Sequence, residues 1–199
     1  LDVVGVDVHI GSQIQALAPL EEAFCKVVDL VHHLRALGAP ISRVDLGGGL
    51  GIPYSTADSP ASPADYAAMI GRVLDGLDVS LILEPGRVIA GNAGVLVAQV
   101  EYIKERDGRR FVILDTAMND LMRPALYGAH HDVLPLNAAS DDAPLSPADL
   151  VGPVCESTDR FAKDRPLPPL SEGDRIAFLS TGAYGAVMSS QYNARPLVP

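Results

Sequence analysis

Residues 41–51 read ISRVDLGGGLG, a short apolar run that ends in a cluster of glycines. Two other stretches have the same form. The apolar run at 3–10 leads into HIGSQ at residues 9–13, and the run at 79–83 leads into EPGR at residues 84–87. Short apolar runs bounded by glycine and proline indicate buried strands. The sequence therefore predicts three buried strands, each followed by residues that can do chemistry.

Helical patterns separate these strands. Residues 19–37 carry apolar side chains at helical spacing up to Gly38, and a second helix is predicted at about 63–77 with Ser62 as its N-cap. Strands that alternate with helices indicate parallel βαβ units, in either a doubly wound sheet or a (β/α)8 barrel. We favour the barrel, because functional groups follow the carboxyl ends of successive strands. Three units are too few to close a barrel, so we expect an upstream part as well.

The second half of the chain has a different pattern from about residue 94. Apolar-rich segments at 95–106 and 109–115 flank Asp107-Gly108, which is a strong hairpin signal. No long amphipathic helix separates the strand-like runs that follow, which lie near 132–136, 150–155 and 175–179. This half therefore predicts an antiparallel β domain.

The change of pattern places a domain boundary near residues 90–94. We expect the C-terminal part of an α/β barrel at 1–92 and an antiparallel β domain at 93–199. Small polar residues and prolines predict an exposed loop at 137–147, and a proline-rich loop is predicted at 165–169.

The composition excludes several classes of protein. The net charge of −10 argues against nucleic acid as a partner, because phosphate contacts need a basic face. No apolar run is long enough to predict a membrane span, and no signal peptide is recognisable, so we expect a cytoplasmic protein. Cys25 and Cys155 form no CxxC pair, and the pairs His32-His33 and His130-His131 point apart, so we expect no metal site.

The glycine cluster is a candidate phosphate site. Glycines at a strand end can expose backbone N–H groups to an anion, although they also occur in plain tight turns. Ser12 would add a hydroxyl at a neighbouring strand end, and Gly86 with Arg87 would add N–H groups and a guanidinium at a third. Three sets of donors at one edge of a sheet favour the phosphate interpretation.

Two more residues at these strand ends have several possible roles. Glu84 could form an ion pair with Arg87, or it could keep the ring nitrogen of a cofactor protonated. His9 could be a base, a metal ligand, a ring that stacks on another ring, or a structural residue. The residues alone leave these alternatives open.

The motifs resemble those of the fold-type III pyridoxal-phosphate-dependent amino-acid decarboxylases, whose fold is alanine-racemase-like. HIGSQ, LGGGLG and EPGR resemble the barrel part of that family. The second half resembles the branch that decarboxylates meso-diaminopimelate to L-lysine, through MRPALY (122–127), GPVCESTD (152–159), GAYG (182–185) and YNARP (192–196). The resemblance covers nearly the whole chain.

This resemblance implies a binding site for pyridoxal 5'-phosphate. His9 would stack on the pyridine ring, and Glu84 would pair with the ring nitrogen. Tyr184 would contact both cofactor and substrate. The phosphate would be surrounded by Ser12, Gly48, Gly49, Gly86 and Arg87, and Arg87 is also a candidate for contact with the substrate.

The resemblance also assigns roles toward an amino-acid substrate. Cys155 would donate a proton to the carbon that loses CO2, and Glu156 would bind the distal ammonium group. Arg123 and Tyr127 would bind the distal carboxylate. In this family the Cys155 and Glu156 positions reach into the partner's active site, which implies a homodimer.

Simpler interpretations exist for several of these residues. Cys155 and Tyr184 could be core residues, and Arg123 could cap a helix end. Cys25 lies in the first helical pattern, and we expect it in the core. The rival functions are a related decarboxylase acting on ornithine, arginine or a carboxylated polyamine, and a non-catalytic module that binds the cofactor.

Lysine is where the chain departs from the family pattern. These enzymes bind the cofactor covalently through a lysine, and this chain has only Lys26, Lys104 and Lys163, none of which ends a predicted strand. We therefore expect this polypeptide alone to be inactive.

Overall fold

The computed structural model of the chain describes residues 2–137 and 143–198. It divides into two compact units. The α/β unit comprises Leu1–Pro53 and Ala57–Ile89, and the β unit comprises Tyr54–Thr56 and Ala90–Pro199. The short segment Tyr54–Thr56 thus lies in the α/β half of the sequence but packs with the β unit, which sequence patterns did not indicate.

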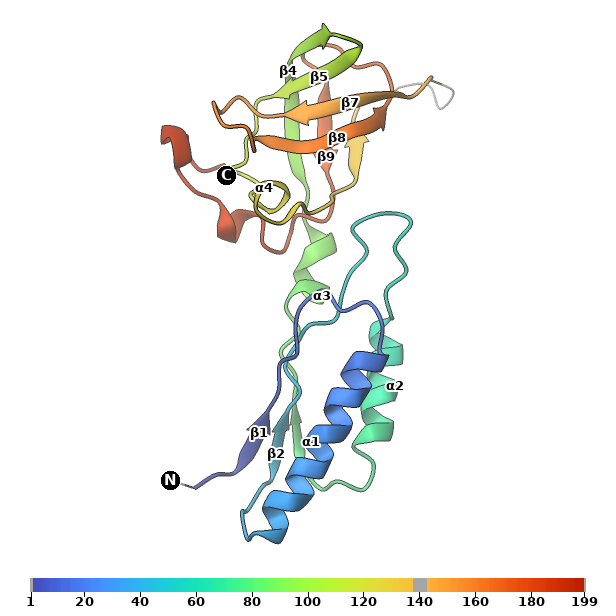
Figure 1. Ribbon diagram of the computed structural model, residues 1–199, viewed down its shortest axis with the longest axis vertical. Coiled ribbons are helices and arrows are strands. Elements are labelled where there is room, and N and C mark those ends of the chain that lie inside the picture. The colour runs from blue at the N-terminus through green and yellow to red at the C-terminus, as the bar shows by residue number, and fades with distance from the viewer. Residues whose placement is uncertain (1, 138–142, 199) are drawn as a thin grey trace. The chain divides into compact units, whose positions relative to one another are not determined.

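The α/β unit is built on a parallel three-stranded sheet (Figure 1). Its strands are β1 (Gly5–Asp7), β2 (Arg43–Asp45) and β3 (Ser80–Ile82), in the order β1-β2-β3. Helices α1 (Ala18–Ala36) and α2 (Pro63–Val73) connect them. The predicted alternation of parallel strands and helices is confirmed.

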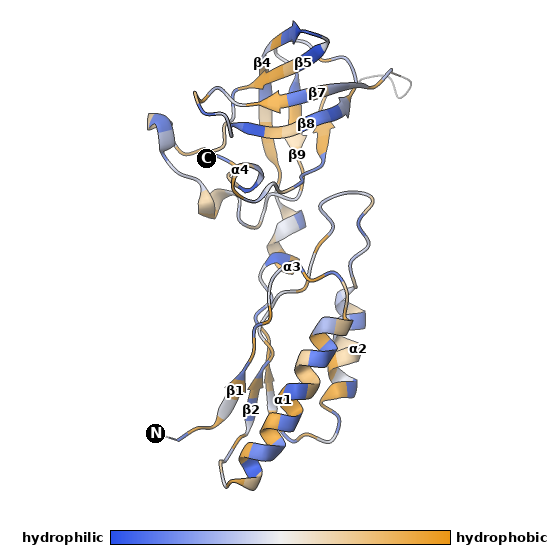
Figure 2. Ribbon diagram, in the orientation of Figure 1, coloured by the Kyte–Doolittle hydropathy of each residue, from blue (hydrophilic) through white to orange (hydrophobic). Residues whose placement is uncertain are grey.

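Helix α1 packs through one apolar stripe, and Figure 2 shows apolar and polar residues alternating along it. The stripe residues Leu20, Phe24, Val27 and Val31 are buried against β2 and α2 in one core. Cys25 is exposed, so its predicted place in the core is wrong. It follows Phe24 directly and is rotated about 100° away from the stripe. Ser62 caps α2 as predicted, because its hydroxyl accepts the N–H of Asp65.

The prediction that all three strands are buried is also wrong for the described chain. In β2, Val44 is fully buried, but Leu81, Ile82 and Leu83 at β3 are 40–42% exposed. The reason is position in the sheet: β1 and β3 are its two edges, and only β2 has a strand on both sides.

The β unit contains a six-stranded sheet in the order β6-β9-β4-β5-β7-β8. The strands are β4 (Leu96–Arg106), β5 (Arg109–Leu114), β6 (Val133–Pro135), β7 (Ser146–Val151), β8 (Arg160–Leu167) and β9 (Arg175–Phe178). The helical segments of this unit are α4 (Arg123–Tyr127) and the 3-10 turns Gly91–Ala93, Ala186–Met188 and Tyr192–Ala194. Helix α3 (Arg87–Ala90) lies where the α/β unit ends and the β unit begins in the sequence.

Several details of this sheet correct the predictions. The sheet is mixed rather than antiparallel, because β5 pairs with β7 in parallel. Strand β7 begins at Ser146, inside the predicted 137–147 loop; residues 138–142 of that loop lie outside the described residues. Strand β8 includes part of the predicted 165–169 loop. The strand-like run predicted at 150–155 overlaps only the end of β7, and residues 152–155 lie in the turn that follows. Prolines concealed the start of β7 and all of β8: Pro166 lies on an edge strand and Pro147 near a strand start, where a missing N–H costs little.

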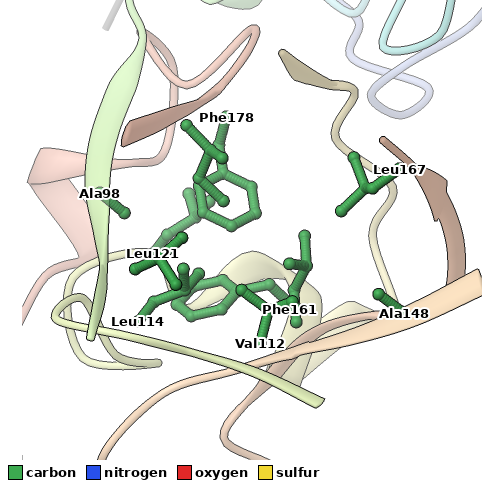
Figure 3. Close-up of a cluster of buried hydrophobic side chains, with 11 residues drawn as sticks. Ala98, Val112, Leu114, Leu121, Ala148, Phe161, Leu167 and Phe178 are labelled. Carbon is green, nitrogen blue, oxygen red and sulfur yellow. The ribbon is translucent and has the colours of Figure 1, made fainter. Parts of the chain in front are cut away.

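The core of the β unit lies between these strands (Figure 3). Phe161 of β8 and Phe178 of β9 pack against each other with their rings tilted by 38° and their centroids 4.7 Å apart. Aliphatic side chains from β4, β5 and β7 complete the cluster, among them Val100, Val112, Leu114 and Leu150. None of the helices in the described part of the chain combines the length and hydropathy needed to cross a membrane.

Candidate functional site

The three strands of the α/β unit are joined tightly just beyond their carboxyl ends. The N–H of Glu84 donates to the carbonyl of Gly47 (2.8 Å), and the N–H of Ile14 donates to the carbonyl of Gly49 (2.9 Å). The carboxylate of Asp45 accepts the N–H of Gly47 (2.8 Å). The glycine cluster therefore lies between the segments that follow β1 and β3.

Close packing explains why glycine occupies these positions. A Cβ on Gly48 would come within 2.3 Å of the carbonyl oxygen of Glu84, and one on Gly49 within 2.3 Å of that of Gly11. Gly49 also has a φ of +100°, which favours glycine. Any side chain here would force the strand ends apart.

Side chains from all three strand ends meet at this edge. The N–H of Gly48 donates to Nδ1 of His9 (3.3 Å), and Nη2 of Arg87 donates to Oγ of Ser12 (3.1 Å). Ser12 and Arg87 are 75 positions apart in the sequence. Gly86 adjoins Arg87 and has open space where a Cβ would lie. The convergence of a hydroxyl, a guanidinium and the glycine cluster was predicted and is found.

Three carboxylates also gather at these strand ends. Oxygen atoms of Asp7, Asp45 and Glu84 lie within 4.8 Å of one another. Sequence reasoning selected Glu84 but missed the two aspartates. The pairing of the strands would have indicated these two aspartates, because Asp7 and Asp45 are paired residues at the ends of the parallel strands β1 and β2. Together they make this edge favourable for a positive charge.

An apolar pocket of about 210 Å³ lies on the α2 side of the glycine cluster. Its lining includes Gly47, Gly48 and Gly49, with Tyr66 of α2 and Pro85 and Gly86 beyond β3. Its walls are mainly carbon, which suits a flat or apolar group better than an ion.

In the β unit, Arg123 is the first residue of α4 and is only 7% exposed. Its Nη1 lies 2.8 Å from Nε2 of His131, and its guanidinium carbon lies 4.3 Å from the centre of the Tyr54 ring. A buried arginine at the amino end of a helix cannot serve as a C-terminal cap, so that interpretation fails. Sequence reasoning missed both contact residues.

Burial keeps His131 neutral. It lowers the pKa of His131 to about 4, and the nearby charge of Arg123 acts in the same direction. Nδ1 of His131 lies 2.8 Å from the carbonyl oxygen of Leu179. A carbonyl only accepts, so Nδ1 carries the proton and Nε2 is left to accept from Arg123.

The two tyrosines predicted in the site are accessible. Tyr127, at the end of α4, is 65% exposed, and Tyr184 is 41% exposed with a positive φ of 59°. The core interpretation of Tyr184 is therefore wrong. A positive φ at a non-glycine residue is costly and is typical of functional segments.

Cys155 and Glu156 are exposed at the tip of a turn between β7 and β8. The core interpretation of Cys155 is therefore wrong as well. Buried Asp159 organises this turn: its two carboxylate oxygens accept the N–H groups of Val154 and Met118, each at 2.7 Å. Burial raises the pKa of Asp159, while these two N–H groups act in the opposite direction.

The candidate residues therefore form two sets. His9, Ser12, Gly48, Gly49, Glu84, Gly86 and Arg87 lie in the α/β unit, and Arg123, Tyr127, Cys155, Glu156 and Tyr184 lie in the β unit. Within each unit they occupy loops and element ends, which is typical of functional residues.

The sequence profile described as "Pyridoxal-dependent decarboxylase, C-terminal sheet domain" matches residues 25–182. The chain belongs to this family of pyridoxal-dependent decarboxylases. It is 50% identical over 199 residues to the diaminopimelate decarboxylase of Vibrio cholerae, covering 100% of this chain and 47% of that protein. The chain thus spans about half the length of the curated relatives it matches.

Solved structures of similar chains have the same fold. Diaminopimelate decarboxylase of Helicobacter pylori, complexed with L-lysine, matches with a TM-score of 0.92 and 45% identity, over 99% of this chain and 48% of that one. A structure of SrLDC in complex with PLP and cadaverine matches with a TM-score of 0.88 and 26% identity, over 99% of this chain and 51% of that one.

Proposed function

We propose that the native protein carrying this chain is a pyridoxal-phosphate-dependent decarboxylase that converts meso-diaminopimelate to L-lysine and CO2. The observation that carries this proposal is the buried guanidinium of Arg123 in a family of pyridoxal-dependent decarboxylases. Diaminopimelate has an amino-acid group at each end, so its recognition requires a group that binds a second carboxylate. A planar guanidinium binds carboxylate bidentately.

The α/β unit would be the C-terminal part of a (β/α)8 barrel. Two features of the unit support this assignment. Its sheet has two edge strands, and the apolar side chains of β3 are exposed, as expected of a strand that pairs with further strands. Its helices follow the strands in the order that a barrel requires.

The residues at the strand ends fit pyridoxal 5'-phosphate. Ser12 and Arg87, which are hydrogen-bonded to each other, would bind the phosphate together with the N–H groups around Gly48, Gly49 and Gly86. Glu84, beside two further carboxylates, would favour a protonated ring nitrogen. His9, held by the N–H of Gly48, would stack on the ring. When bound, the cofactor supplies an electron sink for decarboxylation.

The β unit would supply the groups that act on the substrate. Arg123 and Tyr127 would bind the distal carboxylate, Glu156 the distal ammonium group, and Tyr184 both cofactor and substrate. The thiol of Cys155 would donate its proton to the carbon atom from which CO2 has departed. We also propose that the protein is a homodimer in which Cys155 and Glu156, exposed at the tip of a turn, reach into the active site of the partner subunit. We propose that this homodimer is cytoplasmic.

A substrate panel tests this function. The native protein, supplied with pyridoxal phosphate, is offered meso-diaminopimelate, ornithine, arginine and L-lysine separately, and CO2 and the product amine are measured. We expect turnover of diaminopimelate only. Turnover of L-lysine, ornithine or arginine instead would assign the protein to another branch of the family, and no turnover of any substrate would favour a non-catalytic binding module.

A further inference from the structure

Arg123 is held by two residues that the proposed function does not use. Tyr54, Arg123 and His131 are 7%, 7% and 2% exposed, so this cluster is part of the interior of the β unit. The rings of Tyr54 and His131 meet edge to face, with centroids 5.2 Å apart. Each residue of the cluster therefore contacts the other two.

The two contacts restrain Arg123 in complementary ways. The Tyr54 ring covers the face of the guanidinium at 4.3 Å, which restricts its tilt. Nε2 of His131 accepts from Nη1 at 2.8 Å, which restricts rotation within the guanidinium plane. A long arginine side chain otherwise loses considerable rotamer entropy when it binds a ligand, and restraint in advance reduces that loss.

These contacts also preserve the charge of Arg123. A neutral imidazole and a phenol ring carry no negative charge, so neither contact cancels the positive charge of the guanidinium. The carbonyl of Leu179 keeps His131 in the tautomer that accepts.

We propose that His131 and Tyr54 are positioning residues that orient Arg123 for a substrate's distal carboxylate and thereby determine the preference for a dicarboxylic diamine. This inference rests on the proposed function. If the inference is correct, substitution of His131 or Tyr54 raises KM for the dicarboxylic substrate. The same substitutions leave kcat, and the binding of ligands that lack the distal carboxylate, nearly unchanged.

The test compares variants of the native protein. KM and kcat are measured for meso-diaminopimelate, and the inhibition constant is measured for L-lysine, which lacks the distal carboxylate. In His131→Leu we expect KM to rise roughly 10–100-fold, as for loss of a hydrogen bond to a charged group, with kcat and the inhibition constant of L-lysine within about threefold. His131→Gln keeps an acceptor oxygen near the Nε2 position and should recover most of the KM.

Tyr54 provides a second, independent pair of variants. Tyr54→Leu removes the ring from the guanidinium and should raise KM, whereas Tyr54→Phe keeps the ring and should not. His130→Leu is the matched control, because His130 is the neighbouring, exposed histidine and contacts Asp132 and Arg165 instead. Its KM should equal that of the wild type.

Arg123→Gln separates the two hypotheses. If it raises KM while His131→Leu and Tyr54→Leu do not, the positioning inference is overturned and the proposed function stands. If the wild type fails to turn over diaminopimelate, or Arg123→Gln leaves KM unchanged, the proposed role of Arg123 is wrong and the inference falls with it. An equal loss of diaminopimelate and L-lysine binding in His131→Leu and Tyr54→Leu would indicate a merely structural role and would also overturn it.

Discussion

Asp159 occupies the space in which a side chain on Gly152 would begin. A Cβ at Gly152 would lie 2.3 Å from Oδ2 of Asp159, and the backbone of Gly152 donates to the carbonyl of Asp159 at 3.0 Å. The two residues close the turn that presents Cys155 and Glu156. The N–H of Asp159 also donates to the carbonyl of Glu156 (3.0 Å). The position of these two candidate site residues thus depends on a glycine and a buried aspartate to which the proposed function gives no role.

Gly152→Ala should destabilise the β unit, because the added methyl group must displace the Asp159 carboxylate. We expect a loss of about 1–3 kcal/mol in the free energy of unfolding, as for other overpacked sites, measured by urea denaturation. Gly71→Ala is the matched control: Gly71 lies in α2 with no atom within 4 Å of the added Cβ, so helix propensity should make it neutral or stabilising. Equal stability of Gly152→Ala and wild type would contradict the packing argument.

Cys155→Ala should abolish most turnover of the native protein without unfolding it. Loss of a positioned proton donor typically reduces the rate by about 10²–10⁴-fold, and the exposed thiol contributes little to packing. Cofactor binding, followed by absorbance, should be unchanged. Cys25→Ala changes the other exposed cysteine and should retain full activity. A Cys155→Ala protein with wild-type kcat would exclude this residue as the proton donor.

Acid should destabilise the chain through His131. Its pKa is lowered to about 4, below the ordinary value of 6.5, so the unfolded state takes up a proton before the folded state does. The stabilising contribution of neutral His131 is complete above pH 6.5 and is lost as the pH falls toward 4. The loss should approach about 3 kcal/mol. Urea denaturation at pH 7.5, 5.5 and 4.5 measures it, and a His131→Gln variant with the same acid sensitivity as wild type would refute this assignment.

The 199-residue chain should form no specific covalent link to pyridoxal phosphate. Nζ of Lys26 lies 2.6 Å from Glu22, and the hydrogen bond and the charge of Glu22 raise the pKa of Lys26, which keeps the amine protonated. Lys104 and Lys163 are exposed on strands β4 and β8. Borohydride reduction with one equivalent of cofactor, followed by mass spectrometry, checks this. One lysine modified stoichiometrically would contradict it.

Local features of the fold were predictable from the sequence. The hairpin at Asp107-Gly108 was predicted correctly because this dipeptide tolerates the type I′ geometry that a two-residue hairpin needs. In the structure both residues have positive φ, of 52° and 73°. The helices and parallel strands of the first half were found because each is amphipathic or apolar over a short window. Strand β8 and the parallel pairing of β5 with β7 were missed, because neither has a local signal.

Some residues of the candidate site were likewise predictable from the sequence, and others were not. Ser12 and Arg87 were expected to converge because parallel strands bring their carboxyl ends to one edge, and they are found hydrogen-bonded. Tyr54 and His131 were not recognised, since nothing in their own neighbourhoods in the sequence indicates a contact with Arg123. Cys25 was assigned to the interior from its place in the first helical pattern and Leu81 from its short apolar run, and both are exposed.

The sequence by itself determined which segments form helices and strands and which motifs end them, because hydrophobic period, turn geometry and capping act over a few neighbouring residues. Tertiary structure alone decided which of those residues are buried and which touch. Burial of a charged guanidinium is costly unless polar or aromatic groups lie against it. Beside Arg123 the fold brings together Tyr54, from the first half of the chain, and His131, eight residues further along.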